Sequence, residues 1–257
     1  MKLKAIALTM VLLLTCLACG GRKTDSRFGR DSPDFIMNEG FFLLNQGDLD
    51  QAEKKLLTAL RKNPQLYAAH NALGIIYSFR RDFPAALKHF KMTIKLNSDF
   101  IDAYNSMGMV YCEMGDYKLA RENLQIAAAA PGYQTPENAL VNLALLEIRL
   151  EDWDAALNHI EKGLAVNDRY APLYNLKGSI IENRGRFEEA VQYYEKALSL
   201  LSQPEPEYLF NLGRANYRKG DRNKALDCLN KAMEASRDEL LTREISNLIK
   251  TIRDGRQ

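Results

Sequence analysis

Small and apolar residues recur along most of the chain with one long period. From Pro33 onward a small residue returns about every 34 positions, and an alanine follows each of them twelve positions later. The small residues are Gly40, Gly74, Gly108, Ala144, Gly178 and Gly213, and the alanines are Ala52, Ala86, Ala120, Ala156, Ala190 and Ala225. Apolar residues also recur at helical spacing on two segments of each period. The pattern therefore predicts six helical hairpins that bury their apolar faces against one another.

A turn is expected in the middle of each hairpin. Aspartates that stand just before the second segment can cap it by accepting hydrogen bonds from its free amides, as at Asp48, Asp82, Asp116, Asp152 and Asp221. Glycines can end the first segment in the left-handed conformation, as at Gly47, Gly115, Gly185 and Gly220. The small residues at the recurring positions would let the two helices approach closely.

These repeats resemble the tetratricopeptide repeat, and the resemblance covers almost everything after residue 32. It implies an all-α fold, a right-handed superhelical solenoid of six tetratricopeptide hairpins over residues 33–239. An apolar stripe then predicts a C-terminal capping helix and tail over residues 240–257. Ser236 and Glu239 have the spacing of a capping box, which would start this helix.

The beginning of the chain has a different composition. Lys2 and Lys4 precede an apolar run over residues 5–14, which is too short to span a bilayer and is typical of an export signal. The sequence CLAC at the end of this run resembles the lipobox of bacterial lipoproteins, which implies a lipoprotein signal peptide at residues 1–18. An ordinary signal peptide is the alternative.

The lipobox resemblance implies lipidation at Cys19, with Cys16 as the weaker alternative because it stands where that motif usually has leucine. Residues 19–32 are rich in glycine, serine and charge, and predict a flexible tether. Gly20 follows Cys19, and the sorting rule of enteric bacteria places an aspartate there in lipoproteins of the inner membrane. The expected location is therefore the periplasmic face of the outer membrane, reached through an N-terminal lipid anchor.

The 34-residue spacing is interrupted once by a two-residue insertion, Thr135 and Pro136, between the third and fourth repeats. A tolerated insertion at a surface turn is one interpretation. Taken with the lipobox and the six repeats, the junction PGYQTPENALVNLAL resembles the type IV pilus biogenesis lipoproteins known as pilotins. That resemblance implies an adaptor or chaperone that binds a secretin subunit and promotes its outer-membrane localisation and assembly. The alternative is a tetratricopeptide scaffold lipoprotein of another envelope complex, such as tight-adherence or type II secretion or the cell-wall machinery.

Charge and motifs argue against other classes of function. The 35 basic and 33 acidic residues nearly balance, which is not the footprint of a nucleic-acid-binding protein. The sequence has no glycine-rich phosphate cradle and no set of catalytic residues at a recognisable spacing, so we expect no enzyme activity, cofactor or small-molecule substrate. No two of His70, His89 and His159 lie three to five residues apart, as a metal site on one helix would require, so we expect no metal site.

The family resemblance also implies where a protein partner binds, because the first helices of tetratricopeptide hairpins line the concave face. The residues expected to form a groove there are Met37, Phe41, Leu44, Asn71, Ile75, Phe79, Asn105 and Met109. The side-chain amides of Asn71 and Asn105 can pair with the backbone of an extended peptide, although asparagine at this position of the repeat can equally cap a helix or pack against a neighbour. The expected ligand is an apolar or amphipathic segment, and a second contact is expected at Phe210, Arg214, Tyr217 and Arg218.

Overall fold

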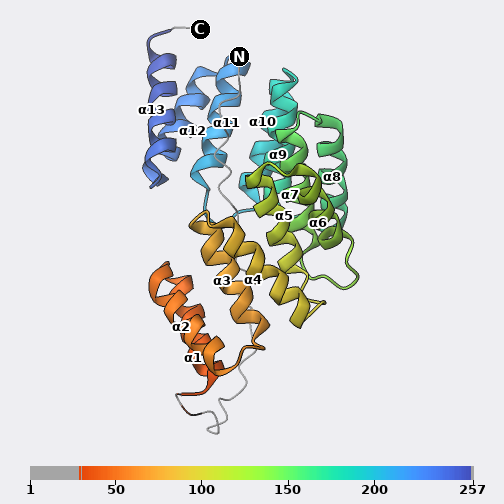
Figure 1. The fold of residues 1–257 in the computed structure, drawn as a ribbon. Coiled ribbons are helices and arrows are strands. Elements are labelled where there is room, and N and C mark those ends of the chain that lie inside the picture. The colour runs from red at the N-terminus through yellow and green to blue at the C-terminus, as the bar shows by residue number, and fades with distance from the viewer. Residues whose placement is uncertain (1–28, 30, 256–257) are drawn as a thin grey trace. The chain divides into compact units, whose positions relative to one another are not determined.

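The structure is a computed structural model that describes residue 29 and residues 31–255, and all of this part that is regular is helical (Figure 1). The expected signal peptide, Cys19 and most of the tether lie outside the described residues. No helix of the described part is both long enough and apolar enough to cross a bilayer. The helices are α1 (Pro33–Asn45), α2 (Leu49–Lys62), α3 (Tyr67–Phe79), α4 (Phe83–Leu96), α5 (Asp102–Met114), α6 (Tyr117–Ala129), α7 (Pro136–Arg149), α8 (Trp153–Val166), α9 (Ala171–Asn183), α10 (Phe187–Ser199), α11 (Pro206–Lys219), α12 (Arg222–Ala235) and α13 (Glu239–Arg253).

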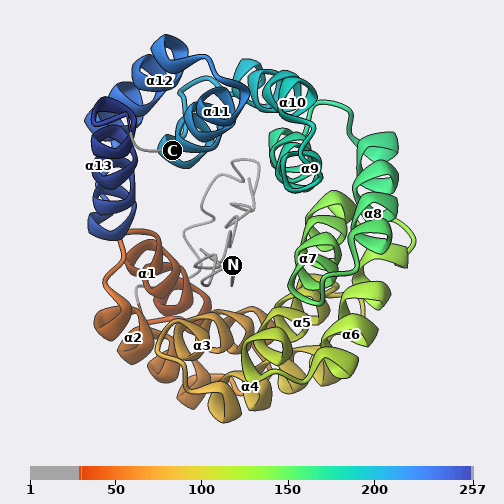
Figure 2. The same ribbon diagram turned by 90° about the horizontal axis from the view of Figure 1, so that it is seen from above.

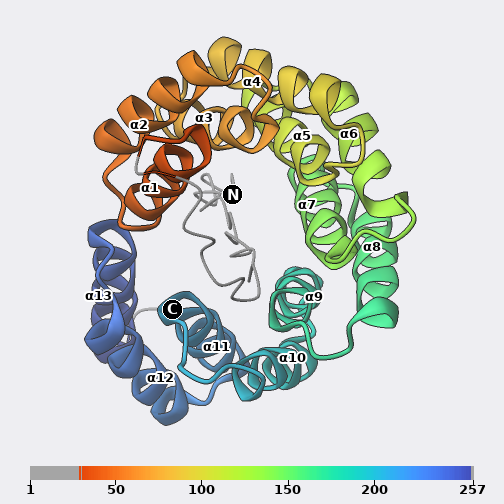
Figure 3. The same ribbon diagram turned by 90° about the horizontal axis from the view of Figure 1, so that it is seen from below.

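The chain divides into two compact units, Met1–Ile126 and Ala127–Gln257. In the first unit α1 pairs with α2 and α3 with α4, and α1, α3 and α5 form one layer while α2 and α4 form the other (Figure 2). In the second unit α7, α9 and α11 pair with α8, α10 and α12 in the same two-layered way (Figure 3). Helix α13 packs on α11 and α12. The expected all-α stack of hairpins with a C-terminal capping helix is confirmed.

The recurring small residues stand where the two helices of a hairpin come closest. A Cβ atom added to Gly74 would lie 2.5 Å from the ring of Phe90, and one added to Gly178 would lie 2.8 Å from the ring of Tyr194. Phe90 and Tyr194 are both completely buried, so neither ring has space to move aside. The period in the sequence is therefore a packing requirement within each hairpin.

The turns match the sequence prediction, and two further turns reach the left-handed conformation without a glycine. Each predicted aspartate accepts a hydrogen bond from the backbone amide three residues on, at 3.0 Å in the case of Asp48 and 3.2 Å in the case of Asp82; the same contact is made by Asp116, Asp152 and Asp221. All four predicted glycines have positive φ. Arg81 and Glu151 take the left-handed conformation without being glycine, each with φ of 60°.

The start of the capping helix differs from the prediction. Ser236 is not the N-cap, because the chain between it and α13 is extended and the helix begins at Glu239. Asp238 caps the helix instead, and its Oδ1 accepts a hydrogen bond from the amide of Leu241 at 2.9 Å. The hydroxyl of Ser236 accepts from the amide of Asp238 and from the hydroxyl of Thr242.

Successive hairpins are tied by ion pairs in one register. In each case a basic residue at the C-terminal end of the first helix of one hairpin pairs with an acidic residue in the first turn of the second helix of the hairpin before it. The pairs are Arg80 with Asp50, Arg184 with Asp154, and Lys219 with Glu188. Such exposed pairs each contribute about 0–1 kcal/mol. They therefore fix the register of the stack more than its stability, which comes from the apolar clusters between the helices.

Candidate partner-binding site

The eight residues predicted to line a groove all lie on the first helices of the first unit, but they differ in exposure. Leu44, Ile75 and Met109 are buried, with 6%, 7% and 5% of their surface exposed. Met37, Phe41, Asn71 and Asn105 are partly buried, and Phe79 is 45% exposed. Most of the expected apolar floor is thus engaged in packing, and Phe79 is the predicted residue that presents a large apolar surface to solvent.

Three of the predicted residues, Met37, Phe41 and Leu44, contribute to the core between the first two hairpins. Met37 and Phe41 pack against the buried cluster that includes Leu44, Leu56 and Leu73. A charged side chain at position 41 would disturb this cluster. The resemblance to the repeat family placed these side chains in a groove, but it did not separate the residues that pack from those that remain open.

Asparagines at equivalent positions of different repeats also differ in the hydrogen bonds that they make. The side-chain oxygen of Asn71 is buried and accepts no hydrogen bond from the described part of the chain. The equivalent oxygen of Asn175 accepts a hydrogen bond from the side chain of Asn211 at 3.2 Å. The Asn71 oxygen is buried, and the Asn175 oxygen already accepts a hydrogen bond within the second unit, so neither presents an exposed acceptor to a peptide backbone.

The structure brings Phe79 and Met109 together in one hollow. This Phe79 hollow has a volume of about 180 Å³ and is lined by Ser78, Phe79, Arg81, Phe83, Met109, Val110 and Glu113. Its floor is apolar because Met109 and Val110 are buried, and Phe79 forms an exposed wall. The hollow lies at the turn end of the second hairpin, where α3 ends, α4 begins and α5 passes alongside.

Arg81 forms the charged rim of the Phe79 hollow. Its guanidinium lies 5.3 Å from the centre of the Phe83 ring, and its Nη1 donates to the Glu113 carboxylate at 3.2 Å. The Arg81 side chain is nevertheless 68% exposed, while that of Glu113 is 20% exposed. The left-handed backbone at Arg81 places this side chain over the turn. The hollow can accept an apolar side chain while Arg81 offers a hydrogen-bond donor to the backbone or a carboxylate beside it.

A second hollow lies on the outer side of the first hairpin, and none of the eight residues predicted to form the groove lines it. This α1 edge has a volume of about 410 Å³ and is lined by Phe35, Asn38, Glu39, Phe42, Leu43 and Lys55. Phe35 is 39% exposed and Phe42 is 63% exposed. The repeat pattern contained this information, because the positions of these two phenylalanines are alanine or aliphatic in the next four repeats, and only the sixth repeat has an aromatic residue at one of them, Tyr208.

Polar side chains also join the first two hairpins, next to the buried cluster around Leu44, Leu56 and Leu73. The hydroxyl of Tyr77 donates to Glu53 at 2.6 Å, and Arg80 donates to the other oxygen of the same carboxylate. These two donors, Tyr77 first, lower the pKa of Glu53. Burial, together with the Glu53 carboxylate, raises the pKa of Tyr77 to about 12. Glu53 is therefore ionised and Tyr77 neutral at physiological pH, and both are engaged in holding the hairpins together.

Two histidines meet inside the second hairpin, on different helices. The Nδ1 atoms of His70 and His89 lie 3.0 Å apart, and Nε2 of His70 lies 3.3 Å from the carbonyl oxygen of Pro64. The Pro64 carbonyl can only accept, so His70 donates from Nε2 and His89 donates to Nδ1 of His70. Burial, and then the neighbouring imidazole, lowers the pKa of His89 to about 4. The spacing rule for a single helix could not reveal this pair.

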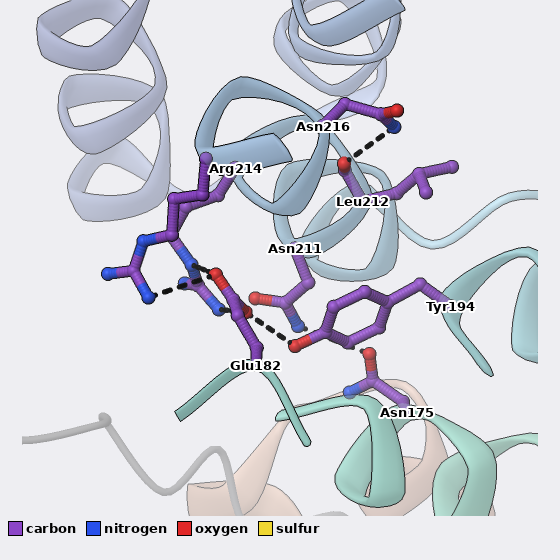
Figure 4. A network of polar contacts seen from close by, with 8 residues as sticks. Asn175, Glu182, Tyr194, Asn211, Leu212, Arg214 and Asn216 are labelled. Atoms are coloured by element: carbon purple, nitrogen blue, oxygen red, sulfur yellow. Dashed lines mark hydrogen bonds and ion pairs between the residues drawn. The ribbon is translucent and has the colours of Figure 1, made fainter. Parts of the chain in front are cut away.

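The second unit holds a buried ion-pair network around Glu182 (Figure 4). Glu182 is 2% exposed and accepts from Nε and Nη2 of Arg214 at 3.0 and 2.8 Å, and from the hydroxyl of Tyr194 at 2.8 Å. Arg218 reaches the same carboxylate at 3.3 Å and is 47% exposed. Of the predicted second contact, Arg214 is thus committed to the interior, and Arg218 is the guanidinium that faces solvent.

The described residues contain no group of three or more histidine, cysteine, aspartate or glutamate side chains arranged to hold a metal ion. The polar networks found here join neighbouring helices, whereas the α1 edge is largely apolar and the Phe79 hollow combines an apolar floor with a charged rim. The arrangement is suited to holding side chains of another polypeptide.

Comparison with known families identifies the repeats. Residues 43–104 and residues 168–238 match family models described as tetratricopeptide repeat. The TPR repeat-containing protein MJ1428 of Methanocaldococcus jannaschii is 35% identical over 98 residues, which are 38% of this chain and 17% of that protein. Protein O-mannosyl-transferase Tmtc3 of Drosophila melanogaster is 36% identical over 63 residues, 24% of this chain and 7% of that protein. The chain therefore spans less than a fifth of the length of these curated relatives.

Solved structures share the fold at low sequence identity. PilW, described as a widely conserved type IV pilus biogenesis factor, has a TM-score of 0.70 at 16% identity, over 83% of this chain and 97% of its own. The structure of PilF from Pseudomonas aeruginosa has a TM-score of 0.68 at 20% identity, over 84% of this chain and 96% of its own. Yeast Tom70 has a TM-score of 0.71 at 13% identity, over 87% of this chain and 47% of its own. The chain is a tetratricopeptide-repeat protein with an all-α fold of stacked helical hairpins.

Proposed function

We propose that the protein is a lipid-anchored adaptor of the pilotin kind, which binds a secretin subunit and promotes its localisation and assembly at the outer membrane for type IV pilus biogenesis. The observation that carries this proposal is the extent of the match to PilW and PilF, which covers 97% and 96% of those chains. The match also covers 83% and 84% of this chain, so it takes in nearly all of the repeats. The lipobox-like CLAC before Cys19 supports the anchor.

The mechanism in this proposal is binding, with no catalytic step. The Phe79 hollow takes an apolar side chain of the secretin subunit, and Arg81 pairs with the backbone or a carboxylate next to it. Covering apolar surface of the subunit stabilises its soluble form by mass action, and the lipid at Cys19 raises the local concentration of the subunit at the membrane where it assembles.

Deletion of the gene tests the proposal directly. Secretin multimers in outer-membrane fractions are expected to disappear in the deletion strain, with monomers in their place, and to return when the parent protein is supplied. Phe79→Glu is expected to fail in this complementation although its helical signal and melting temperature match the parent. Val166→Glu is the matched control, because Val166 is a similarly exposed apolar residue, at 56%, on α8. Normal multimers in the deletion strain would refute the proposal.

A scaffold role in another envelope complex is the second candidate. It is supported by the breadth of the fold, since the Cut9 and Hcn1 complex of the anaphase-promoting complex and Tom70 match as well as PilW does, with TM-scores of 0.72 and 0.71. The same deletion strain separates the two candidates, because a tight-adherence, type II secretion or cell-wall defect with intact pili would assign the protein to that other complex.

A further inference from the structure

The α1 edge is the outer face of the first hairpin and has an equivalent face in the later hairpins. Phe35 and Phe42 stand at the third and tenth positions of the first repeat, counted from Pro33. The third position of the second repeat is Ala69 and the tenth is Ile76, and both are completely buried. The same holds for two further repeats inside the units, at Ala103 with Val110 and at Leu173 with Ile180, where the exposed fraction is at most 1%.

A helix covers this face wherever a hairpin precedes it within a unit. Helix α2 packs on α3, α4 packs on α5 and α8 packs on α9. At the first of these junctions α2 contributes Leu57 and Leu60, three residues apart, to the cluster that contains Ala69 and Ile76. The α1 edge is the continuation of the same interface, so its geometry suits a helix that carries apolar residues at spacings of three or four.

The composition of the α1 edge is that of an interface. An end of a repeat stack that faces water only is expected to be polar. The last helix meets this expectation apart from one exposed leucine, Leu240, since the outer side of α13 carries Arg243, Asn247 and Lys250, all exposed. The α1 edge instead presents two phenylalanines that are 39% and 63% exposed, on either side of a hollow of about 410 Å³. Aromatic residues of this kind are enriched where proteins bind one another.

Charge and shape restrict the occupant. Helix α1 carries Asp34 and Glu39 and no lysine or arginine, and Lys55 of α2 pairs with Glu39 at 2.7 Å. Leu240 is the large apolar side chain that α13 leaves exposed, so this helix offers a single leucine and not an apolar stripe, and a head-to-tail stack of copies through it fits the α1 edge poorly. A helix with a basic residue beside its apolar stripe complements the edge.

We propose that the α1 edge is a docking face for an amphipathic helix of another protein, which lies across Phe35 and Phe42 with its apolar stripe in the hollow between them and a basic residue toward Asp34. The two phenylalanines are seven residues apart, which is about 10.5 Å along α1, so the stripe that meets them spans about two turns of the partner helix. This contact is separate from the Phe79 hollow and does not depend on which protein occupies that hollow.

A photo-crosslinking amino acid at position 42 of the full chain, expressed in its native cells, tests the proposal. Adducts are expected on a second protein, at residues spaced three or four apart on one face of a helix. The same amino acid at position 166 on α8 is the control and should give no such adduct. Adducts with this chain itself, with a second copy, with lipid or with an extended peptide would overturn the proposal, as would the absence of any adduct specific to position 42.

A binding measurement with the mapped segment as a synthetic peptide gives the second test. Phe42→Asp in the full chain is expected to weaken binding of this peptide at least tenfold while circular dichroism and melting stay at the parent values, because Phe42 is mostly in solvent. Val166→Asp should leave the affinity unchanged. Asp34→Lys should weaken binding less, and the difference should shrink at high salt. Equal affinities for the parent and Phe42→Asp would overturn the proposal even if adducts had formed.

Discussion

The buried network around Glu182 gives a sharp prediction about which arginine is structural. In Arg214→Met the carboxylate of Glu182 loses two hydrogen bonds, at 3.0 and 2.8 Å, and keeps those from Tyr194 and Arg218. Glu182 is 2% exposed, so water cannot replace the lost donors. Methionine retains most of the apolar stem, and therefore the substitution tests the guanidinium itself.

The expected cost follows from the burial of the two partners. Breaking a fully buried ion pair from one side costs about 3–5 kcal/mol, because an unpaired charge is left in the interior. The Arg214 side chain is 29% exposed and two other donors remain, so we expect about 2–3 kcal/mol. For a chain of this size each kcal/mol lowers the melting temperature by about 2–4 °C, which gives a loss of about 5–10 °C.

Thermal melts followed by circular dichroism measure this cost, and hydrogen exchange in α9 to α11 shows whether the loss is local. Lys219→Met is the matched control, since Lys219 lies on the same helix and pairs with Glu188, which is 77% exposed. This control should lose less than about 1 kcal/mol. Adding Glu182→Gln to Arg214→Met should recover part of the loss, because the buried charge is then gone. If Arg214→Met melts within 1 °C of the control, the network does not stabilise the second unit.

Three further outcomes are expected. Gly74→Ala should lower the unfolding free energy by about 1–3 kcal/mol in urea titrations, since the new methyl group would press on the buried ring of Phe90, and an unchanged midpoint would contradict the close approach of these helices. Burial, and then the neighbouring imidazole, lowers the pKa of His89 to about 4 in the folded protein. As the pH falls below about 6.5, the unfolded chain therefore becomes protonated at His89 before the folded chain does, which favours unfolding. The parent should therefore lose about 1 kcal/mol through His89 between pH 7 and pH 5.5, allowing for partial exposure, and burial also lowers the pKa of His70, which adds to this loss. Melts at the two pH values should show that His89→Leu removes most of the loss while His159→Leu keeps it. Phe41→Glu should reduce the melting temperature, because Phe41 packs against the first core cluster, and a parent-like melt would mean that its side chain is not part of that cluster.

The hairpins could be predicted from the sequence because each repeats the same local requirements. A small residue such as Gly74 must face a large one such as Phe90, and an aspartate such as Asp82 must cap the second helix. The capping helix was predicted as well, but its first residue was not, since Ser236 and Asp238 both offer side-chain oxygens and only the path of the chain decides which of them meets a free amide.

The binding surface was predicted less well, for physical reasons. The resemblance to the repeat family identifies a helix face, yet burial along that face depends on how tightly the next hairpin packs, which left Ile75 buried and Phe79 exposed. The residues of the α1 edge were not predicted, because the spacing of an apolar residue such as Phe42 along a helix is the same whether a neighbouring helix covers it or leaves it exposed. The contact between His70 and His89 joins two helices, and no spacing within one helix encodes it.

The central proposal is that the protein holds a secretin subunit through the Phe79 hollow of its first unit. Affinity purification from native membranes, with the amount of secretin recovered per molecule of protein, measures this most directly for the parent, Phe79→Glu and Val166→Glu. The account predicts that secretin co-purifies with the parent and with Val166→Glu, and that recovery with Phe79→Glu falls at least tenfold. Secretin that is absent from the parent sample, or recovered equally with all three, would contradict it.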